Sequence, residues 1–199
     1  MVLGVLALQG AFIEHQKMFK ELGVETFQIR NKDQLKKPMD GIVLPGGEST
    51  TMYRILRDQE MVEDLKSIIN SGLPTFGTCA GLLLLAKEVD NYKSDYLQTM
   101  NIEAKKNAYG RQLGSFKSHG EFNGEKDIPF IFIRAPYIVR VNDGVEVLSI
   151  VDDKIVAAKE KNQLVTAFHP ELTDHLIVHK YFIDMIKNRK SADDKEQIK

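Results

Sequence analysis

The N-terminal part of the chain alternates between two hydrophobic patterns. Residues 2–8 (VLGVLAL) form a continuous apolar run of strand length, which is typical of a strand buried on both faces. Over residues 11–22 the apolar side chains recur at helical spacing, and Gly23 is placed to end that helix. Residues 24–29 and 41–44 have the composition of further strands. This alternation predicts an α/β fold, a three-layer sandwich whose mostly parallel central sheet is flanked by helices.

The rest of the chain adds strands of a different kind. Residues 74–77 are expected to form a short fourth strand, and residues 80–87 the helix that follows it. From Tyr96 onward, strand-like segments are separated by turn residues, which predicts an antiparallel extension of the sheet. A last helix is expected to begin near Thr173 or Asp174, where either side chain can cap it. Its buried face should consist of Ile177, Val178, Tyr181, Phe182 and Met185.

Composition and charge describe an ordinary globular chain. No repeat or linker divides the sequence, so we expect one domain over residues 1–189 and a polar tail over residues 190–199. Hydrophobic residues make up 43% of the chain, and the formal net charge of −1 gives no global attraction to nucleic acid or to an anionic membrane. No apolar run approaches the roughly 20 residues needed to span a bilayer. A single cysteine forms no internal disulfide, so we expect a cytoplasmic protein.

The only cysteine, Cys79, lies in residues 76–84 (FGTCAGLLL), between a predicted strand and a predicted helix. A free cysteine is often simply a small buried core residue. Here the flanking glycines, Gly77 and Gly81, permit the sharp turn of a nucleophile elbow in which cysteine replaces serine. The N-terminus of the helix would stabilise a thiolate, and the backbone N–H of Ala80 would face a reacting carbonyl. The setting therefore favours a nucleophile over a core residue.

A base for this thiol is predicted at His169, in the segment VTAFHPEL. The histidine follows a strand-like run, and Pro170 removes the next backbone donor. If the chain stays extended, Glu171 lies on the same face two residues later, where its carboxylate can orient the imidazole. Polar residues on the surface after a strand are the alternative, but Cys…His-x-Glu in this order favours a catalytic triad.

The other four histidines are expected to be structural or solvent-exposed. His15 lies on the apolar face of the first predicted helix and is expected to be partly buried and hydrogen-bonded. His119 lies in a loop-like stretch and is expected to be solvated. His175 and His179 stand four residues apart, as metal ligands can, but the glutamate of H-E-x-x-H is missing and no cysteine is near. No metal site is expected.

A glycine-rich loop, LPGGESTT (44–51), joins the third strand to the next helix. It lacks the spacing and the lysine of a P-loop, and the chain has no G-x-G-x-x-G at a predicted strand-to-helix turn. Adjacent glycines allow backbone N–H groups to face a developing negative charge, so an oxyanion hole is one interpretation. A plain helix entry capped by Ser49 is the other, and the two are compatible.

Three motifs, PGGES, GTCAG and FHPE, resemble in order and spacing those of class I glutamine amidotransferases. Longer strings resemble one branch of that superfamily, the glutaminase subunits of pyridoxal 5′-phosphate synthase, over about residues 2–188. These strings are LALQGAF-x-EH (6–15), PGGESTT (45–51), GTCAGLLLLA (77–86), NAYGRQ (107–112), FIRAP (132–136) and FHPELT (168–173).

The resemblance implies a role for each matching residue. Cys79 would be the nucleophile, His169 the general acid and base, and Glu171 its orienting partner. The oxyanion would form against the backbone amides of Gly47 and Ala80. Glutamine would be held by Gly46, Gly47, Glu48, Ser49, Lys106, Ile133 and Arg134. Lys106 replaces an arginine that is common in the family, and Gly114 replaces a usual aspartate; neither belongs to the triad.

The implied reaction is hydrolysis of L-glutamine to glutamate and ammonia, without a metal or organic cofactor. Ammonia would pass to a partner, the (β/α)8-barrel synthase subunit that builds vitamin B6, and Gln9 with Gly10 would lie near the glycine loop at the docking surface. Two other classes remain open from the residues. One is another cysteine hydrolase on the same scaffold, such as a γ-glutamyl peptidase, and the other is a non-catalytic binding module with a structural Cys79.

Overall fold

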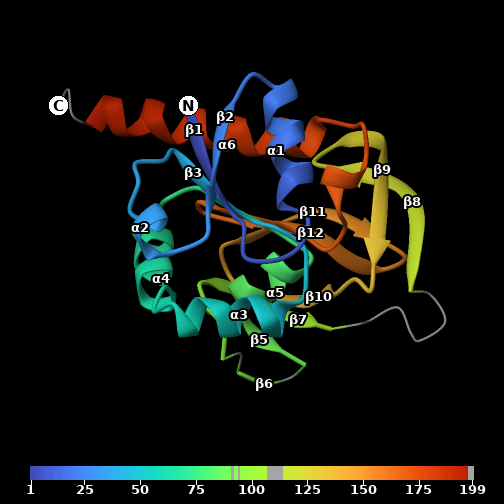
Figure 1. The fold of residues 1–199 in the computed structure, drawn as a ribbon. Helices are drawn as coiled ribbons and strands as arrows, with labels where there is room; N and C mark the ends of the chain where they lie inside the picture. Colours follow the sequence, from blue (N-terminus) through green and yellow to red (C-terminus); the bar gives the residue numbers. More distant parts are fainter. Residues whose placement is uncertain (91, 94, 107–113, 197–199) are drawn as a thin grey trace.

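A computed structural model of the chain describes residues 1–90, 92–93, 95–106 and 114–196 (Figure 1). Its central sheet begins with a parallel part in which every neighbouring pair of strands runs in the same direction. Because these strands are parallel, their carboxyl ends lie along one edge of the sheet. Their order is β2 (Glu25–Ile29), β1 (Val2–Leu6), β3 (Gly41–Leu44), β4 (Thr75–Thr78) and β13 (Gln163–Thr166).

Beyond β13 the sheet continues as the predicted extension, in which the pairs β13–β12, β12–β10 and β10–β7 are antiparallel. The further strands are β12 (Lys154–Glu160), β10 (Tyr137–Val141), β7 (Met100–Lys105), β5 (Ala86–Val89) and β6 (Tyr92–Lys93), with β11 (Val145–Val151) paired to β12. A separate antiparallel hairpin is formed by β8 (Ser115–Phe122) and β9 (Glu125–Ile133). The predicted α/β fold with an antiparallel extension is confirmed.

Helices cover both faces of the sheet (Figure 1). On one side lie α1 (Phe12–Glu21) and α6 (Ile177–Glu196), and on the other α3 (Ser49–Asp58), α4 (Val62–Asn70) and α5 (Ala80–Leu85). A one-turn helix, α2 (Lys32–Leu35), occupies the connector between β2 and β3. Aromatic rings join the layers, since the ring of Phe182 on α6 lies 5.5 Å from Phe76 on β4 and 6.3 Å from Phe19 on α1.

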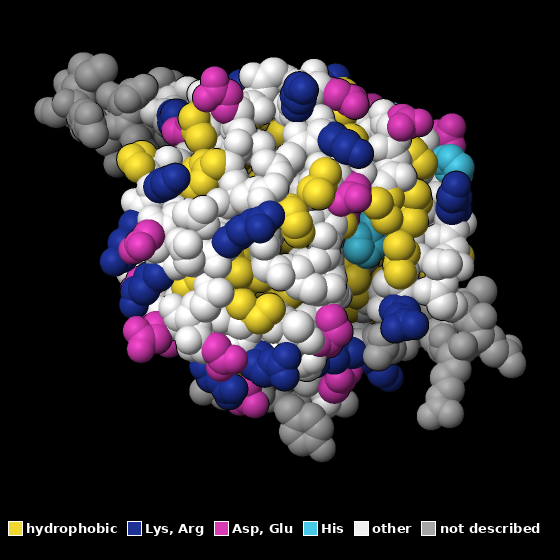
Figure 2. All heavy atoms as spheres, in the orientation of Figure 1, with side chains coloured by type: hydrophobic (Ala, Val, Ile, Leu, Met, Phe, Trp, Pro, Cys, Tyr) yellow, Lys and Arg dark blue, Asp and Glu magenta, His cyan; other side chains and the backbone are white. Residues whose placement is uncertain are grey.

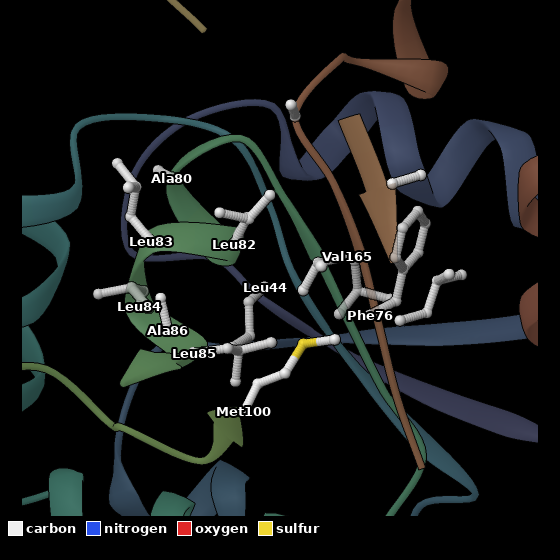
Figure 3. Close-up of a cluster of buried hydrophobic side chains, with 14 of the residues drawn as sticks. Leu44, Phe76, Ala80, Leu82, Leu83, Leu84, Leu85, Ala86, Met100 and Val165 are labelled. Atoms are coloured by element: carbon white, nitrogen blue, oxygen red, sulfur yellow. The ribbon is translucent and has the colours of Figure 1, made fainter. Parts of the chain in front are cut away.

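Helix α5 carries four consecutive leucines, Leu82–Leu85, and all of them are buried. The helix contacts β3, β4 and β13 of the sheet as well as α3. Figure 3 shows these leucines grouped with Leu44 of β3 and Val165 of β13. Burial of apolar side chains around the whole helix holds its first residue, Ala80, in a fixed place at the edge of the sheet.

Two predicted helix boundaries are wrong. Helix α5 ends at Leu85 rather than near Lys87, because Ala86 has extended dihedral angles (φ −61°, ψ 137°) and opens β5. Helix α6 begins at Ile177 rather than near Thr173, because residues Pro170–Leu172 first form a 3₁₀ helix, η1.

Thr173 makes a different hydrogen bond from the helix cap that the sequence predicted. The Thr173 hydroxyl accepts a hydrogen bond from the backbone N–H of His175 at 3.2 Å, before the helix has begun. Of the predicted apolar face, Val178 and Phe182 are buried and the others pack partly buried against the core. At its other end α6 continues to Glu196, so helix extends into the expected tail.

The face of the molecule seen in Figure 2 carries no dominant charge. Figure 2 shows acidic and basic side chains interspersed over the viewed face, with hydrophobic side chains between them. His119 is exposed as expected, although it lies on strand β8 and not in a loop. Among the described residues, no helix is long and apolar enough to cross a membrane.

Candidate active site

The predicted site residues converge at the carboxyl edge of the parallel strands. Cys79 directly follows β4, and the glycine loop that begins at Pro45 directly follows β3. His169 comes three residues after the end of β13, which pairs with β4. Since β3, β4 and β13 are adjacent in the sheet, segments far apart in the sequence meet above it.

Cys79 stands on a strained turn. Its backbone has φ 48° and ψ −97°, a conformation that residues with a side chain rarely adopt, and its N–H donates to Thr166 O at 2.8 Å. The neighbouring glycine is required by space, because a Cβ on Gly81 would lie 2.0 Å from Leu44 O. The thiol is only 7% exposed, and its Sγ lies 3.9 Å from Ile133 O. This is the geometry that the flanking glycines predict for a nucleophile elbow.

His169 and Glu171 form a buried pair, with His169 Nδ1 2.7 Å from Glu171 Oε1. The route differs from the prediction: the chain is not extended here, and the η1 turn brings the carboxylate to the ring. Burial opposes a charge on the imidazole, but interactions with Cys79 and Glu171 outweigh it and raise the pKa of His169 to about 10. The ring is therefore cationic at neutral pH, beside the sulfur that would become the thiolate.

The glycine loop packs on the imidazole and on the segment after β1. A Cβ on Gly46 would lie 2.2 Å from His169 Cε1, so the loop approaches the ring at a distance that only glycine allows. Glu48 N donates to Gln9 Oε1 at 2.6 Å, and Ala11 N donates to Gly46 O at 3.0 Å. The predicted proximity of Gln9 and Gly10 to the loop is thus present in the structure.

Glu48, not Ser49, caps helix α3. Its carboxylate accepts from Thr50 N at 3.2 Å and from Thr51 N at 2.7 Å, while Ser49 is already the first residue of the helix. Hydrogen bonds from Thr50 and Thr51 lower the pKa of Glu48 to about 2. The side chain is exposed, so its effect on stability is screened by solvent.

Sequence reasoning missed Tyr96, which links two predicted contacts for glutamine. Its hydroxyl lies 3.3 Å from Ser49 Oγ and accepts from Lys106 Nζ at 2.7 Å. Ile133 is 40% exposed beside Cys79, and Arg134 is exposed with a left-handed backbone (φ 43°). The string NAYGRQ lies outside the described residues.

Two further histidines were missed as neighbours of the site. His15 was expected to be partly buried, and it is wholly buried, with Nε2 3.5 Å from Glu171 Oε2. His179 is buried against it, whereas His175 is exposed and precedes α6, so the metal-like spacing brings no two ligands together. In the part of the chain that the structure describes, no group of three or more side chains could hold a metal ion.

Comparison with known proteins places this architecture among amidotransferases. The fold resembles a solved glutamine amidotransferase with a TM-score of 0.88 and 38% identity, covering 94% of this chain and 100% of the other. A second solved glutamine amidotransferase, from Thermotoga maritima, shares the fold alone, with a TM-score of 0.60 and 14% identity over 100% of this chain and 85% of the other.

Sequence comparison shows to which family of glutamine amidotransferases the chain belongs. The pyridoxal 5′-phosphate synthase subunit PdxT of Streptococcus pneumoniae serotype 2 (strain D39 / NCTC 7466) is 54% identical over 192 residues, which are 95% of this chain and 100% of the relative. The model of the SNO glutamine amidotransferase family matches residues 5–188. With the match spanning nearly the whole chain and the folds alike, the chain belongs to the SNO glutamine amidotransferase family.

Proposed function

We propose that this chain hydrolyses L-glutamine through a thioester on Cys79 and supplies the ammonia to the synthase subunit of pyridoxal 5′-phosphate synthase. Its family and its 54% identity to PdxT make it a glutamine amidotransferase of vitamin B6 synthesis. The observation that carries the residue roles is the buried His169–Glu171 pair, 2.7 Å apart, beside a cysteine held on a left-handed turn.

In the first half of the reaction, the Cys79 thiolate attacks the side-chain carbonyl carbon of glutamine. The carbonyl π electrons move to oxygen, and the backbone N–H groups of Gly47 and Ala80 stabilise the oxyanion. Ala80 is the first residue of α5, and the first amides of a helix have no intrahelical acceptor, which leaves this donor available. The carbon–nitrogen bond then breaks, and the His169 imidazolium protonates the departing ammonia.

In the second half, His169 is neutral and takes a proton from water as the water attacks the thioester carbonyl. Collapse of the second tetrahedral intermediate breaks the carbon–sulfur bond and releases glutamate. The thiolate and the imidazolium are restored, so one glutamine and one water give one glutamate and one ammonia. Glu171 Oε1 holds the ring in the tautomer and the orientation that both halves need.

The glutamine itself would lie between the glycine loop and residues 133–134. Gly46, Gly47, Glu48 and Ser49 supply one wall of this space, and Ile133 and Arg134 the other. Lys106 would act on glutamine indirectly, since its ammonium donates to Tyr96, whose hydroxyl lies beside Ser49. A lysine ammonium is a single point charge and lacks the bidentate geometry of an arginine guanidinium. The position of Lys106 therefore depends on its contact with Tyr96.

The partner is proposed to be a (β/α)8-barrel subunit that docks over the Gln9–Gly10 segment. Gln9 supports this idea because its side chain holds the backbone of the glycine loop through Glu48 N. A partner that touches this segment therefore acts directly on the oxyanion loop. We infer a cytoplasmic location from the single cysteine, which can form no internal disulfide.

The test is release of ammonia and glutamate from L-glutamine by the chain with and without its synthase subunit. We expect partner-stimulated turnover, and we expect Cys79→Ala to lower it by about 10⁴-fold or more while the fold is kept. Turnover of γ-glutamyl peptides without the partner would instead indicate a peptidase. If Cys79→Ala matched the parent in every assay, the thiol would have no catalytic role.

A further inference from the structure

The triad carboxylate has one oxygen that the triad does not use. Glu171 Oε1 faces His169, while Oε2 is buried and makes no hydrogen bond of ordinary length among the described residues. The Nε2 of His15 lies 3.5 Å from Oε2, and both side chains are wholly shielded from solvent. A buried carboxylate oxygen is costly unless a donor faces it, so the state of His15 decides how well Glu171 is held.

His15 is itself placed by two contacts from other elements. Its Nδ1 lies 3.0 Å from Nε2 of His179 on α6, and its Nε2 lies 3.1 Å from the hydroxyl oxygen of Thr78, the residue before Cys79. Burial lowers the pKa of His179 to about 3, and burial together with the neighbouring His179 and His169 lowers the pKa of His15 well below its usual value. Both rings are therefore neutral at neutral pH, and each carries a single N–H.

The single proton between the two rings has two possible positions. If His15 Nδ1 held it, the unprotonated Nε2 of His15 would turn a lone pair toward the Glu171 carboxylate. In that case His179 would carry its own proton on Nδ1, which has no hydrogen-bond partner among the described residues. If His179 Nε2 holds the proton, it donates to His15, and only an acceptor atom, His179 Nδ1, is left alone.

The second arrangement has the lower energy, because it leaves no buried N–H without an acceptor and sets no lone pair against an anion. It also determines the tautomer of His15: with Nδ1 accepting from His179, the N–H is on Nε2. That N–H faces the Thr78 hydroxyl and Glu171 Oε2. The three elements α1, β4 and α6 thus converge on the short η1 turn that carries the carboxylate.

Resting on the function proposed above, we propose that His179 and His15 form a positioning relay for the triad. His179 fixes the Nε2–H tautomer of His15, and His15 in turn holds the free oxygen of Glu171, so that Oε1 stays directed at His169. Neither histidine touches the substrate. Their effect reaches the reaction only through the orientation of His169.

The test compares His179→Phe, which removes the donor and keeps a ring, with His179→Gln, whose amide N–H can still donate to His15. With the synthase subunit present, we expect His179→Phe to lower kcat about tenfold, the effect of losing one ordinary hydrogen bond, and to leave KM for glutamine within about twofold. His179→Gln should recover most of that loss. Phe182→Leu, a packing change on the same face of α6, is the matched control and should lower the melting temperature without lowering kcat.

A spectroscopic measurement makes the test independent of whether the variants fold well. In the parent labelled with ¹⁵N-histidine, the imidazole nitrogens report their protonation directly. We expect the N–H of His15 on Nε2 in the parent, and a mixture of tautomers in His179→Phe. An N–H on Nδ1 of His15 in the parent would overturn the relay, as would equal kcat losses in His179→Phe, His179→Gln and Phe182→Leu.

The two proposals fail in different ways. The tautomer of His15 is a property of the folded chain and is read without glutamine or partner. If the parent released no ammonia, or Cys79→Ala matched it, the proposed function would fail while the tautomer was still measured. If turnover depended on Cys79 but the His15 tautomer or the kcat pattern was wrong, the relay alone would fail.

Discussion

On the buried side of the active site, formed by His169, Glu171, His15 and His179, every side chain is enclosed by the core. On the loop side, formed by residues 46–49, Gly47 and Glu48 are exposed. The buried side is held by α1, α6, β4 and η1 together, whereas the loop side contacts the segment after β1 through two hydrogen bonds. The groups that would move protons are therefore fixed by folding, while the loop that would supply Gly47, one of the two proposed oxyanion donors, is tied at few points.

The largest expected effect comes from the buried turn that carries Cys79, at Gly81. In Gly81→Ala the new Cβ would lie 2.0 Å from the backbone oxygen of Leu44, which cannot rotate away as a side chain can. We expect the free energy of unfolding to fall by about 3 kcal/mol, at the upper end of what overpacking usually costs, with loss of turnover. Urea unfolding measures this. Gly114→Ala, whose Cβ meets nothing within 4 Å among the described residues, is the control and should change stability little.

Breaking the loop side at Gln9 should cost activity more than stability. Gln9→Ala removes the acceptor for Glu48 N, so the loop loses one of its contacts with the segment after β1. We expect partner-stimulated kcat to fall about tenfold, with less effect on glutamine affinity measured by calorimetry. Gln16→Ala, on α1 and bonded to Thr26, is the matched control. Loss of glutamine affinity with unchanged stimulation would contradict a docking role for this segment.

The smallest expected effect concerns the cap of α3. Glu48→Ala should lower the free energy of unfolding by about 1 kcal/mol at neutral pH, as loss of a helix N-cap does. The pKa of Glu48 is lowered to about 2 in the folded chain, so its contribution is complete above pH 4.5 and is lost as the pH falls toward 2.

Urea unfolding of the parent and Glu48→Ala between pH 7 and pH 3 measures this difference. The two should differ equally at pH 7 and pH 5 and converge below about pH 4.5. Glu63→Ala, an exposed position in the first turn of α4, should show a cost under about 0.5 kcal/mol. A difference between the parent and Glu48→Ala that grows as the pH falls would contradict the assigned cap.

The sequence predicted the parts of the site whose signals are local. Gly77 and Gly81 around Cys79 indicate a turn, and His169 with Glu171 lie only two residues apart. Even there the route was wrong, because a helical turn and not an extended chain brings the carboxylate to the ring. The pairing of His169 with Glu171 was predictable, since either route places the two side chains side by side.

The other features of the site depend on contacts between segments far apart in the sequence, which no local sequence pattern reveals. His15 and His179 are 164 residues apart and meet only because α1 and α6 cover the same face of the sheet. Tyr96 reaches Ser49 across 47 residues in the same way. One signal was present: His15 lies on the apolar face of its helix, where a polar side chain needs a buried partner. The four-residue spacing of His175 and His179 suggested instead that the two share a helical face, but His175 precedes α6.

The left-handed backbone of Cys79 has a consequence for how this protein can evolve. Position 79 has the dihedral angles at which glycine is unstrained, and the strain of holding a side chain there is on the order of 1–3 kcal/mol. A Cys79→Gly change would relieve that strain while ending thiol chemistry. With Cys79 as the proposed nucleophile, selection for fold stability alone would favour its loss, and only selection for turnover would keep it.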